Sequence, residues 1–375
     1  TAYTAPLAGA IKARVSKPVF VAGRINQPQI AEAVLAAGQA DMCGMTRALI
    51  SDPEMPAKAR AGRLDDIRAC IACNQACIGH MLNGCAISCI QHPETGRELE
   101  FGALAAAPEP RKVMVVGGGP AGMKSAAVAA ARGHRVTLFE AGPALGGQVA
   151  LAQSLPGRAE FGGLATNLAR EMALAGVALR LNTRVTAALV AEEAPDAIVL
   201  ATGAQPHAPP LDGAEEAHVV TAWQVLMGEA NVGSRAVIAD WRCDWVGMGL
   251  AERLARDGCH VRLAVNGMMA GQSIPQYARD TWLGTLHRLG VEILPHLRLF
   301  GADAEDAYFQ HVLSGEPVIL EGVDTLVTAL GHRPETALEE SLEGWPGALH
   351  VIGDCLSPRT AEEAVLEGLR AGAAL

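Results

Sequence analysis

The chain lacks several features that would identify a broad class of protein. Only 4 % of its residues are aromatic, no apolar run is long enough to cross a bilayer, and lysine and arginine form no cluster. With a formal net charge of -10, we expect neither nucleic acid nor a membrane surface as a partner. No secretory signal pattern is visible, although a chain that starts at Thr1 without methionine leaves a longer precursor open.

Glycine, in contrast, is abundant. The 41 glycines among 375 residues indicate many tight turns and nucleotide-binding loops. Half of the residues are hydrophobic, so a chain of this length can bury more than one core. We therefore expect two or three domains.

Four cysteines follow the spacing C-x2-C-x3-C-x11-C, namely Cys70, Cys73, Cys77 and Cys89. Three thiolates in one tight loop can ligate three corners of a 4Fe-4S cluster while a later segment supplies the fourth. A zinc ribbon usually brings two separate C-x2-C pairs to one ion, and inert core cysteines show no such spacing. The pattern favours an iron-sulfur cluster over both alternatives. Cys85 is an alternative fourth ligand.

The total of nine cysteines is odd, and four of them belong to the cluster pattern. Such usage favours a reducing compartment over disulfide bonds. We expect the protein to be cytoplasmic.

The first part of the chain alternates between helix and strand. Apolar periodicity predicts helices over residues 7–15 and 28–37 and buried strands over residues 18–22 and 40–43. These are two βα units.

Each of these strands ends in a glycine and arginine element. Gly23 and Arg24 follow the first strand, and Gly44, Thr46 and Arg47 follow the second. Glycine lets backbone N–H groups approach a phosphate, and arginine binds its oxygens in a forked geometry. The elements indicate a phosphate site, although such pairs are weak signals alone.

A dinucleotide fingerprint lies in the middle of the chain. A short buried strand over residues 112–116 runs into Gly117, Gly119 and Gly122, and Glu140 closes the next strand. The glycines permit the turn, the helix N-terminus holds a pyrophosphate, and the acid accepts a hydrogen bond from a ribose hydroxyl. The sequence therefore predicts that this unit binds a dinucleotide.

An internal repeat sets the domain map. Residues 196–206 recur as residues 324–334, each an acid, a buried strand and a glycine and proline turn. This arrangement resembles glutathione-reductase-like flavoproteins, in which such strands mark chain crossings between two nucleotide-binding units, and the resemblance implies that residues 213–322 are an inserted second unit. The first unit then resumes and reaches Gly353 and Asp354, which resemble the segment beside the flavin in that superfamily; the alternative is an ordinary turn.

The second unit has an altered fingerprint. With Gly247 aligned as the last glycine, the first two glycine positions hold Arg242 and Asp244. Their side chains occupy the space that a pyrophosphate needs, and the aspartate repels it. The following strand ends at Asn266 without an acid. We expect that NAD(P)H binding has been lost here, the alternative being a modified loop that still accepts a nucleotide.

Residues 17–28, 40–47 and 62–67 together resemble strands seven and eight of the FMN barrel of the family of 2,4-dienoyl-CoA reductase, trimethylamine dehydrogenase and histamine dehydrogenase. The similarity continues through nearly the whole chain. That family has a complete eight-stranded barrel, of which roughly six strands are missing here. The chain is then a fragment of a longer polypeptide, or another chain supplies the rest.

The resemblance implies cofactors and their contacts, including a 4Fe-4S cluster beside the flavin with Cys89 preferred over Cys85 as its fourth ligand. It implies FMN contacts, completed by the missing part of the barrel, at Gly23, Arg24, Thr46, Arg47 and Gln75. In addition to the fingerprint glycines and Glu140, it implies FAD or ADP contacts at Ala121, Gln148, Arg158, Val185, Gly353 and Asp354. The family's catalytic residues lie mostly in the missing part, so none is assigned.

The expected fold class is α/β, with a C-terminal remnant of a TIM barrel and a 4Fe-4S segment followed by two nested Rossmann-like domains. The expected domains are residues 1–65 (barrel), 66–107 (cluster segment and linker), 108–212 with 323–375 (FAD or ADP), and 213–322 (degenerate second unit).

The expected function is oxidation or N-demethylation of a small N-methylated amine or amino acid. In this interpretation FMN passes electrons through the cluster to an acceptor such as an electron-transferring flavoprotein, and the enzyme is a homo-oligomer. The alternatives are an NAD(P)H-dependent enoate reductase, which needs an intact second fingerprint, and a non-catalytic electron-transfer or nucleotide-binding module.

Overall fold

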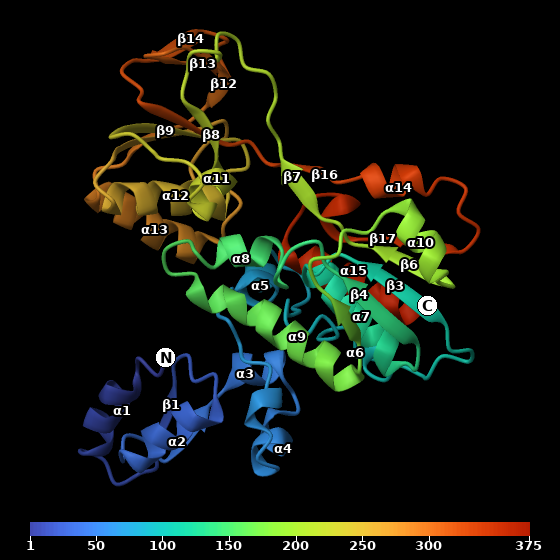
Figure 1. Cartoon of the computed structure of the whole chain (residues 1–375). Helices are drawn as coiled ribbons and strands as arrows, with labels where there is room; N and C mark the ends of the chain where they lie inside the picture. The colour runs from blue at the N-terminus through green and yellow to red at the C-terminus, as the bar shows by residue number, and fades with distance from the viewer.

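The structure, a computed structural model, describes residues 1–375 and has three lobes (Figure 1). No helix in it combines the length and the apolar character that crossing a membrane requires.

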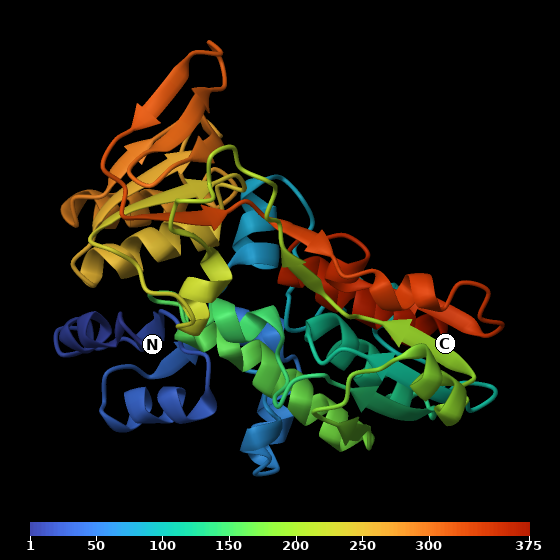
Figure 2. The ribbon, with the colours of Figure 1, turned by 45° about the horizontal axis from the view of Figure 1, so that its top comes forward.

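The N-terminal lobe is a small βα segment at one end of the molecule, drawn in blue in Figures 1 and 2. Its strands β1 and β2 pair in parallel, with Phe20 opposite Met42, and both of these side chains are exposed. The elements are α1 (Ala5–Lys12), β1 (Phe20–Ala22), α2 (Pro28–Ala36), β2 (Met42–Gly44), α3 (Thr46–Ser51) and α4 (Met55–Arg60).

The cysteine segment follows and is mostly irregular. It contains a π-helical turn at Gln75–Gly79, which opens directly into α5 (His80–Leu82). A 3-10 turn at Leu64–Asp66 precedes this segment and α6 (Glu98–Phe101) ends it.

The first nucleotide-binding unit has a five-stranded parallel sheet in the order β17-β6-β3-β4-β5. Its strands are β3 (Lys112–Val116), β4 (Arg135–Phe139), β5 (Ala178–Arg180), β6 (Ala197–Leu200) and β17 (Ala348–Val351). Its helices are α7 (Pro120–Ala131), α8 (Gln148–Ala152), α9 (Gly163–Ala175), α10 (Ala187–Glu193), α14 (Ala337–Ser341) and α15 (Ala361–Ala374).

Both faces of this sheet are covered, as strands of a parallel sheet require. Side chains alternate along β3, so Val113 and Val115 pack against α7, α9 and α15, whereas Met114 and Val116 lie in the core on the α10 side.

The second unit has its own parallel sheet in the order β11-β10-β9-β15-β8. Its strands are β8 (Val219–Thr221), β9 (Arg235–Asp240), β10 (His260–Val265), β11 (Glu292–Leu294) and β15 (Thr325–Ala329). β15 was expected in the first unit, which was predicted to resume at residue 323, and that boundary is wrong by one strand. β15 pairs with β9 and β8, so the chain returns to the first unit after residue 329.

The two faces of the second sheet have different covers. The helices α11 (Ala222–Met227), α12 (Trp245–Arg256) and α13 (Gln276–Arg288) pack on one face. An antiparallel sheet of β12 (Leu297–Ala302), β13 (Ala307–His311) and β14 (Pro317–Leu320) packs on the other.

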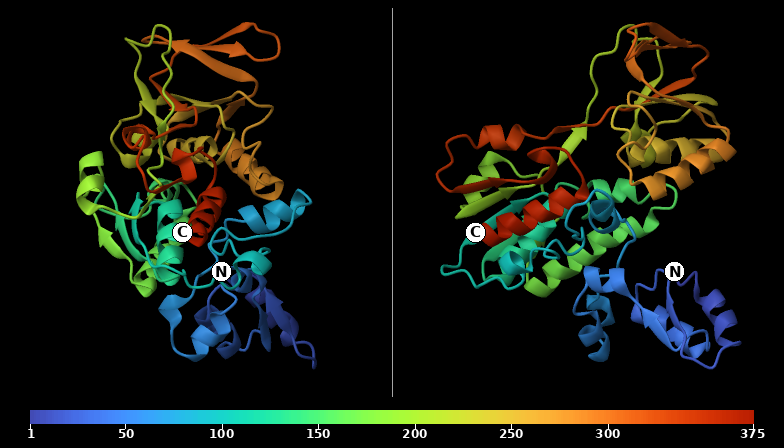
Figure 3. Two further views of the ribbon diagram at one scale, coloured as in Figure 1. Left: turned by 90° about the vertical axis from the view of Figure 1, so that its right-hand side faces the viewer. Right: turned by 180° about the vertical axis from the view of Figure 1, so that it is seen from behind.

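The two chain crossings between the units lie side by side, because β7 (Ala204–Pro206) and β16 (His332–Pro334) form an antiparallel ribbon. Figure 1 and the right-hand view in Figure 3 show this ribbon leading from one lobe to the other. The predicted α/β class, with parallel Rossmann-like sheets behind a short βα segment, is confirmed.

Candidate functional site

Four cysteines surround one small enclosed cavity in the cysteine segment. Cys70, Cys73, Cys77 and Cys89 line it with Arg47, Ile50, Ile71, Asn74, Ala76, Ile90 and Gln91. Cys85 does not line this cavity; it is exposed, and its thiol lies 3.7 Å from the carbonyl oxygen of Asn83. No three histidine, cysteine or acidic side chains converge on a position for a single ion.

Local backbone geometry turns these cysteines inward. Ala72 and Asn74 adopt left-handed φ values of 53° and 58°, which reverse the chain between Cys70 and Cys77. The Ser88 N–H then donates to the Ala76 carbonyl at 2.8 Å and fixes the later segment beside the loop.

The donor set fits an iron-sulfur cluster. Thiols are soft ligands, and the wall between them is largely apolar, as a buried cluster prefers. Burial raises the pKa of Cys73 to about 12, so the free thiol is neutral and ligation would release its proton.

The residues expected to contact FMN divide into two groups. Arg47 lines the cysteine cavity and donates to Asn74 at 2.5 Å, and the buried Oε1 of Gln75 has no hydrogen-bond partner. Arg24 instead pairs with Glu160 at 2.5 Å, while its buried Nε has no partner. The two orphaned polar atoms fit a polar ligand such as a flavin.

The other two expected FMN contacts, Gly23 and Thr46, lie at the ends of the two strands. A Cβ on Gly23 would lie 2.2 Å from the hydroxyl oxygen of Thr4, so a larger residue there would have to displace the Thr4 side chain. Thr46 begins α3 directly after β2.

The glycine loop of the first unit has the geometry that a dinucleotide requires. Gly117 adopts a φ of 111°, and a Cβ on Gly122 would lie 2.0 Å from the Gly117 carbonyl oxygen. Gly119 is the N-cap of α7 and has no side chain to cap the helix, and nothing lies within 4 Å of where its Cβ would be. The helix N-terminus therefore has N–H groups and space for an anion.

Glu140 lies beside this loop. Its carboxylate accepts hydrogen bonds from the N–H groups of Gly118 at 2.7 Å and Gly142 at 2.6 Å. These bonds fix the carboxylate at the end of β4, where a ribose would lie, and its other lone pairs remain for the sugar.

The structure brings Gly353 and Asp354 to the same site. A Cβ on Gly353 would lie 2.9 Å from that of Ala121, and the amide of Gln148 donates to Asp354 at 2.7 Å. Segments more than 200 residues apart are thereby joined around the fingerprint.

Val185 and Arg158 lie in different surroundings. Val185 is buried in the core with Phe139, so its side chain is not free to contact a ligand. The Arg158 guanidinium lies 4.6 Å from the ring centre of Phe161 and 4.1 Å from that of Trp245, which belongs to the second unit. Burial lowers the pKa of Arg158 to about 10.

The altered loop of the second unit closes its own helix N-terminus. Asp244 is the N-cap of α12 and accepts from the Val246 N–H at 2.9 Å, while Arg242 donates to it at 2.8 Å. Asp240, at the end of β9, accepts from the N–H groups of Arg242 and Cys243. The Asp244 carboxylate thus caps the N-terminus of α12, whereas no side chain caps the equivalent N-terminus of α7 in the first unit.

Sequence reasoning missed a buried ionic network beside the cysteine segment. The ammonium of Lys124 lies 2.8 Å from Glu94 and 3.4 Å from Glu171, and Arg68 lies 3.2 Å from Glu171. The only sequence signal is a lysine within the apolar helix after the fingerprint, which is not specific.

The fold and the glycine loop together define a Rossmann-like nucleotide-binding protein. The family model described as pyridine nucleotide-disulphide oxidoreductase matches residues 111–345, and the NADH:flavin oxidoreductase / NADH oxidase family model matches residues 4–66.

Two curated relatives and one solved structure are similar over nearly the whole chain. A metal reductase of Desulforamulus reducens is 35% identical, over 96% of this chain and 58% of the relative. An N,N-dimethylglycine/sarcosine dehydrogenase of Chromohalobacter salexigens is 34% identical, over 97% and 58%. The structure of a histamine dehydrogenase from Rhizobium sp. 4-9 superposes with a TM-score of 0.90 at 26% identity, over 97% of this chain and 59% of that one.

The chain belongs to the pyridine nucleotide-disulphide oxidoreductase family, joined to the end of an NADH:flavin oxidoreductase segment as in the trimethylamine and histamine dehydrogenase-like flavoproteins. The predicted resemblance is therefore confirmed. The chain spans just under three fifths of the length of these relatives.

Proposed function

We propose that the chain is the cluster-binding and nucleotide-binding part of an iron-sulfur flavoprotein dehydrogenase that oxidises a small N-methylated amine or amino acid. Electrons would leave a barrel-bound FMN through a 4Fe-4S cluster to an external acceptor such as an electron-transferring flavoprotein. The relatives support flavin-dependent oxidation or reduction, and one of them is named as acting on dimethylglycine and sarcosine.

The closed N-terminus of α12 is the observation that supports electron flow from FMN to an external acceptor rather than from NAD(P)H to FMN. The Asp244 carboxylate already accepts from the helix N–H that an incoming pyrophosphate would need, and Arg242 is paired to it. A nicotinamide dinucleotide would have to displace this pair and approach a like charge. A reductase that takes electrons from NAD(P)H at this unit is therefore disfavoured.

The chain's own residues would perform distinct tasks. Cys70, Cys73, Cys77 and Cys89 would hold the cluster, which supplies one-electron transfer when bound. Arg47 and Gln75 would contact the flavin where it lies beside the cysteine loop, and would orient it there.

In the first unit, the open N-terminus of α7 would bind the pyrophosphate of FAD or ADP, and Glu140 would hold the ribose. Arg158 is also proposed to contact FAD or ADP, and to do so it would have to leave its stacked position on Trp245. The domain map is also proposed, with the return to the first unit moved to the end of β15.

The second candidate function is an NAD(P)H-dependent reductase. The relative named a metal reductase favours reduction over oxidation, although its name does not give the electron donor; it is 35% identical to the chain, compared with 34% for the dehydrogenase.

Anaerobic reduction of the full-length protein distinguishes the two. Dimethylglycine or trimethylamine is added to one sample and NADH or NADPH to another, and the visible absorbance is followed. We expect the amine alone to bleach the flavin and cluster. Rapid bleaching by a nicotinamide would overturn the dehydrogenase proposal.

A further inference from the structure

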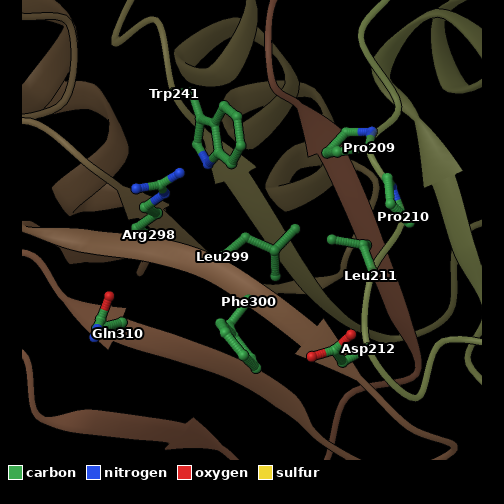
Figure 4. A pocket seen from close by; sticks show the side chains of 9 residues that line it. All are labelled: Pro209, Pro210, Leu211, Asp212, Trp241, Arg298, Leu299, Phe300 and Gln310. Carbon is green, nitrogen blue, oxygen red and sulfur yellow. The ribbon is translucent and has the colours of Figure 1, made fainter.

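A cavity of about 400 Å³ lies in the second unit, apart from the cysteines and the fingerprint (Figure 4). Its lining comes from the connection after β7, from Trp241 at the end of β9, and from the outer face of the antiparallel sheet. None of its residues has a task in the proposed reaction. Its volume lies in the range of small-molecule sites.

One side of this cavity has hydrogen-bond donors without acceptors. The buried indole Nε1 of Trp241 has no hydrogen-bond partner. The Arg298 guanidinium lies 5.7 Å from the centre of the Trp241 ring and forms no ion pair. Figure 4 shows both groups on the same side of the cavity. Indole and guanidinium groups can only donate hydrogen bonds. An anion bound between the two groups could accept a hydrogen bond from each.

The remaining surface is apolar. Leu299 and Phe300 line it along β12; Leu299 is buried in the core, whereas Phe300 is 61% exposed. Pro209 and Pro210 stand opposite Trp241 and Arg298 in Figure 4. Proline fixes its own φ, so this wall is stiff. An aromatic ring between the two walls would cover exposed apolar surface on both sides.

Two polar residues complete the lining. Gln310 lies directly across the strand pair from Arg298, and its Nε2 donates to the Gly315 carbonyl. Asp212 lies at the far wall, where its backbone bridges to Gly301. A carboxylate there disfavours a ligand that is anionic at both ends.

We propose that this cavity binds a small aromatic monocarboxylate, with the carboxylate between Trp241 Nε1 and the Arg298 guanidinium and the ring between Phe300 and the proline wall. This proposal does not depend on the proposed function.

The test is titration of the purified cofactor-loaded protein with benzoate, followed by NMR of the indole N–H groups and by calorimetry. The resonance absent from Trp241→Phe identifies the Trp241 N–H. We expect benzoate to shift it, with acetate and benzyl alcohol much weaker because each lacks one half of the recognised chemistry.

Matched variants assign the contacts. Arg298→Gln should weaken benzoate binding roughly tenfold, the usual effect of losing a charge-assisted hydrogen bond. Trp241→Phe keeps a ring but loses the donor and should weaken it several-fold. Arg288→Gln, which changes an exposed arginine on α13, should leave the affinity unchanged.

The proposal is overturned if benzoate at about 10 mM gives neither heat nor a shift. It is also overturned if acetate or benzyl alcohol binds as tightly as benzoate, or if Arg298→Gln binds benzoate within twofold of the unaltered protein. Circular dichroism of each variant confirms that it is folded.

Discussion

The side-chain ammonium of Lys124 lies 2.8 Å from a carboxylate oxygen of Glu94, with only 3% of the lysine side chain exposed. Lys124 belongs to α7, directly after the fingerprint, and Glu94 follows the last cysteine of the cluster pattern. The pair therefore connects the cysteine segment to the helix that would bind the pyrophosphate.

Removing the charge of Glu94 should destabilise the protein. Glu94→Gln leaves a buried ammonium with only its longer contact to Glu171, and breaking such a pair costs about 3 kcal/mol of unfolding free energy. Urea denaturation measures this loss. Glu100→Gln, at an exposed position on α6, should change the unfolding free energy by less than about 0.5 kcal/mol. Equal effects of the two substitutions would contradict the assigned pair.

The same pair predicts acid sensitivity. Burial alone would raise the pKa of Glu94, but Lys124 and His92 outweigh it, so the pKa lies below its usual 4.5. A carboxyl group with a depressed folded pKa stabilises the protein above its unfolded pKa and loses this stabilisation as the pH falls through the folded value. The denaturation midpoint of the unaltered protein should therefore fall more below pH about 4.5 than that of Glu94→Gln.

Asp240 should have the opposite pH dependence. Burial, with the neighbouring charge of Asp244, raises the pKa of Asp240 to about 8. The folded state then binds a proton that the unfolded state has released, so stability declines as pH rises between about 4 and 8. The slope is at most about 1.4 kcal/mol per pH unit.

Asp240→Asn removes this ionisation and should flatten the decline in the denaturation midpoint. Asp257→Asn, at the exposed end of α12, is the control and should keep the slope of the unaltered protein. An Asp240→Asn variant with an unchanged slope would show that Asp240 is ionised in the folded state.

Two glycines of the fingerprint should respond differently to alanine. Gly122→Ala would place a Cβ 2.0 Å from the Gly117 carbonyl oxygen and should lower the thermal midpoint. Gly119→Ala meets nothing within 4 Å, so the midpoint of the nucleotide-free protein should hold, while affinity for FAD or ADP drops roughly tenfold or more. Unchanged nucleotide affinity in Gly119→Ala would argue against pyrophosphate binding at α7.

The choice between Cys89 and Cys85 can be tested by iron content. Cys89→Ser removes a lining thiol of the cavity and should lose most iron, labile sulfide and broad visible absorbance, whereas Cys85→Ser should retain them. The reverse result would make Cys85 the fourth ligand.

Local signals explain what the sequence could predict. β3 covers residues 112–116 as expected, because its apolar run is bounded by a proline and by glycines. The position of α12 behind Arg242 and Asp244 also follows from the fingerprint spacing.

Long-range partners could not be predicted in the same way. The placement of β15 depends on pairing with β9, some 90 residues earlier in the chain, and its repeat partner β6 lies in the other sheet. Lys124 and Glu94 are 30 residues apart and show no periodic relationship. The unpaired Arg298 and Trp241 become visible only once their side chains lie beside one cavity.

The ribbon of β7 and β16 also limits how the two nucleotide-binding units can move. Because both covalent connections pass through a single pair of short strands, rotation about the ribbon axis breaks none of its hydrogen bonds, whereas sliding one connection past the other breaks them all. Such a rotation would also have to separate Arg158 from Trp245 and withdraw Leu155, which follows α8 in the first unit, from the core of the second unit, so contacts outside the ribbon hold the two units together.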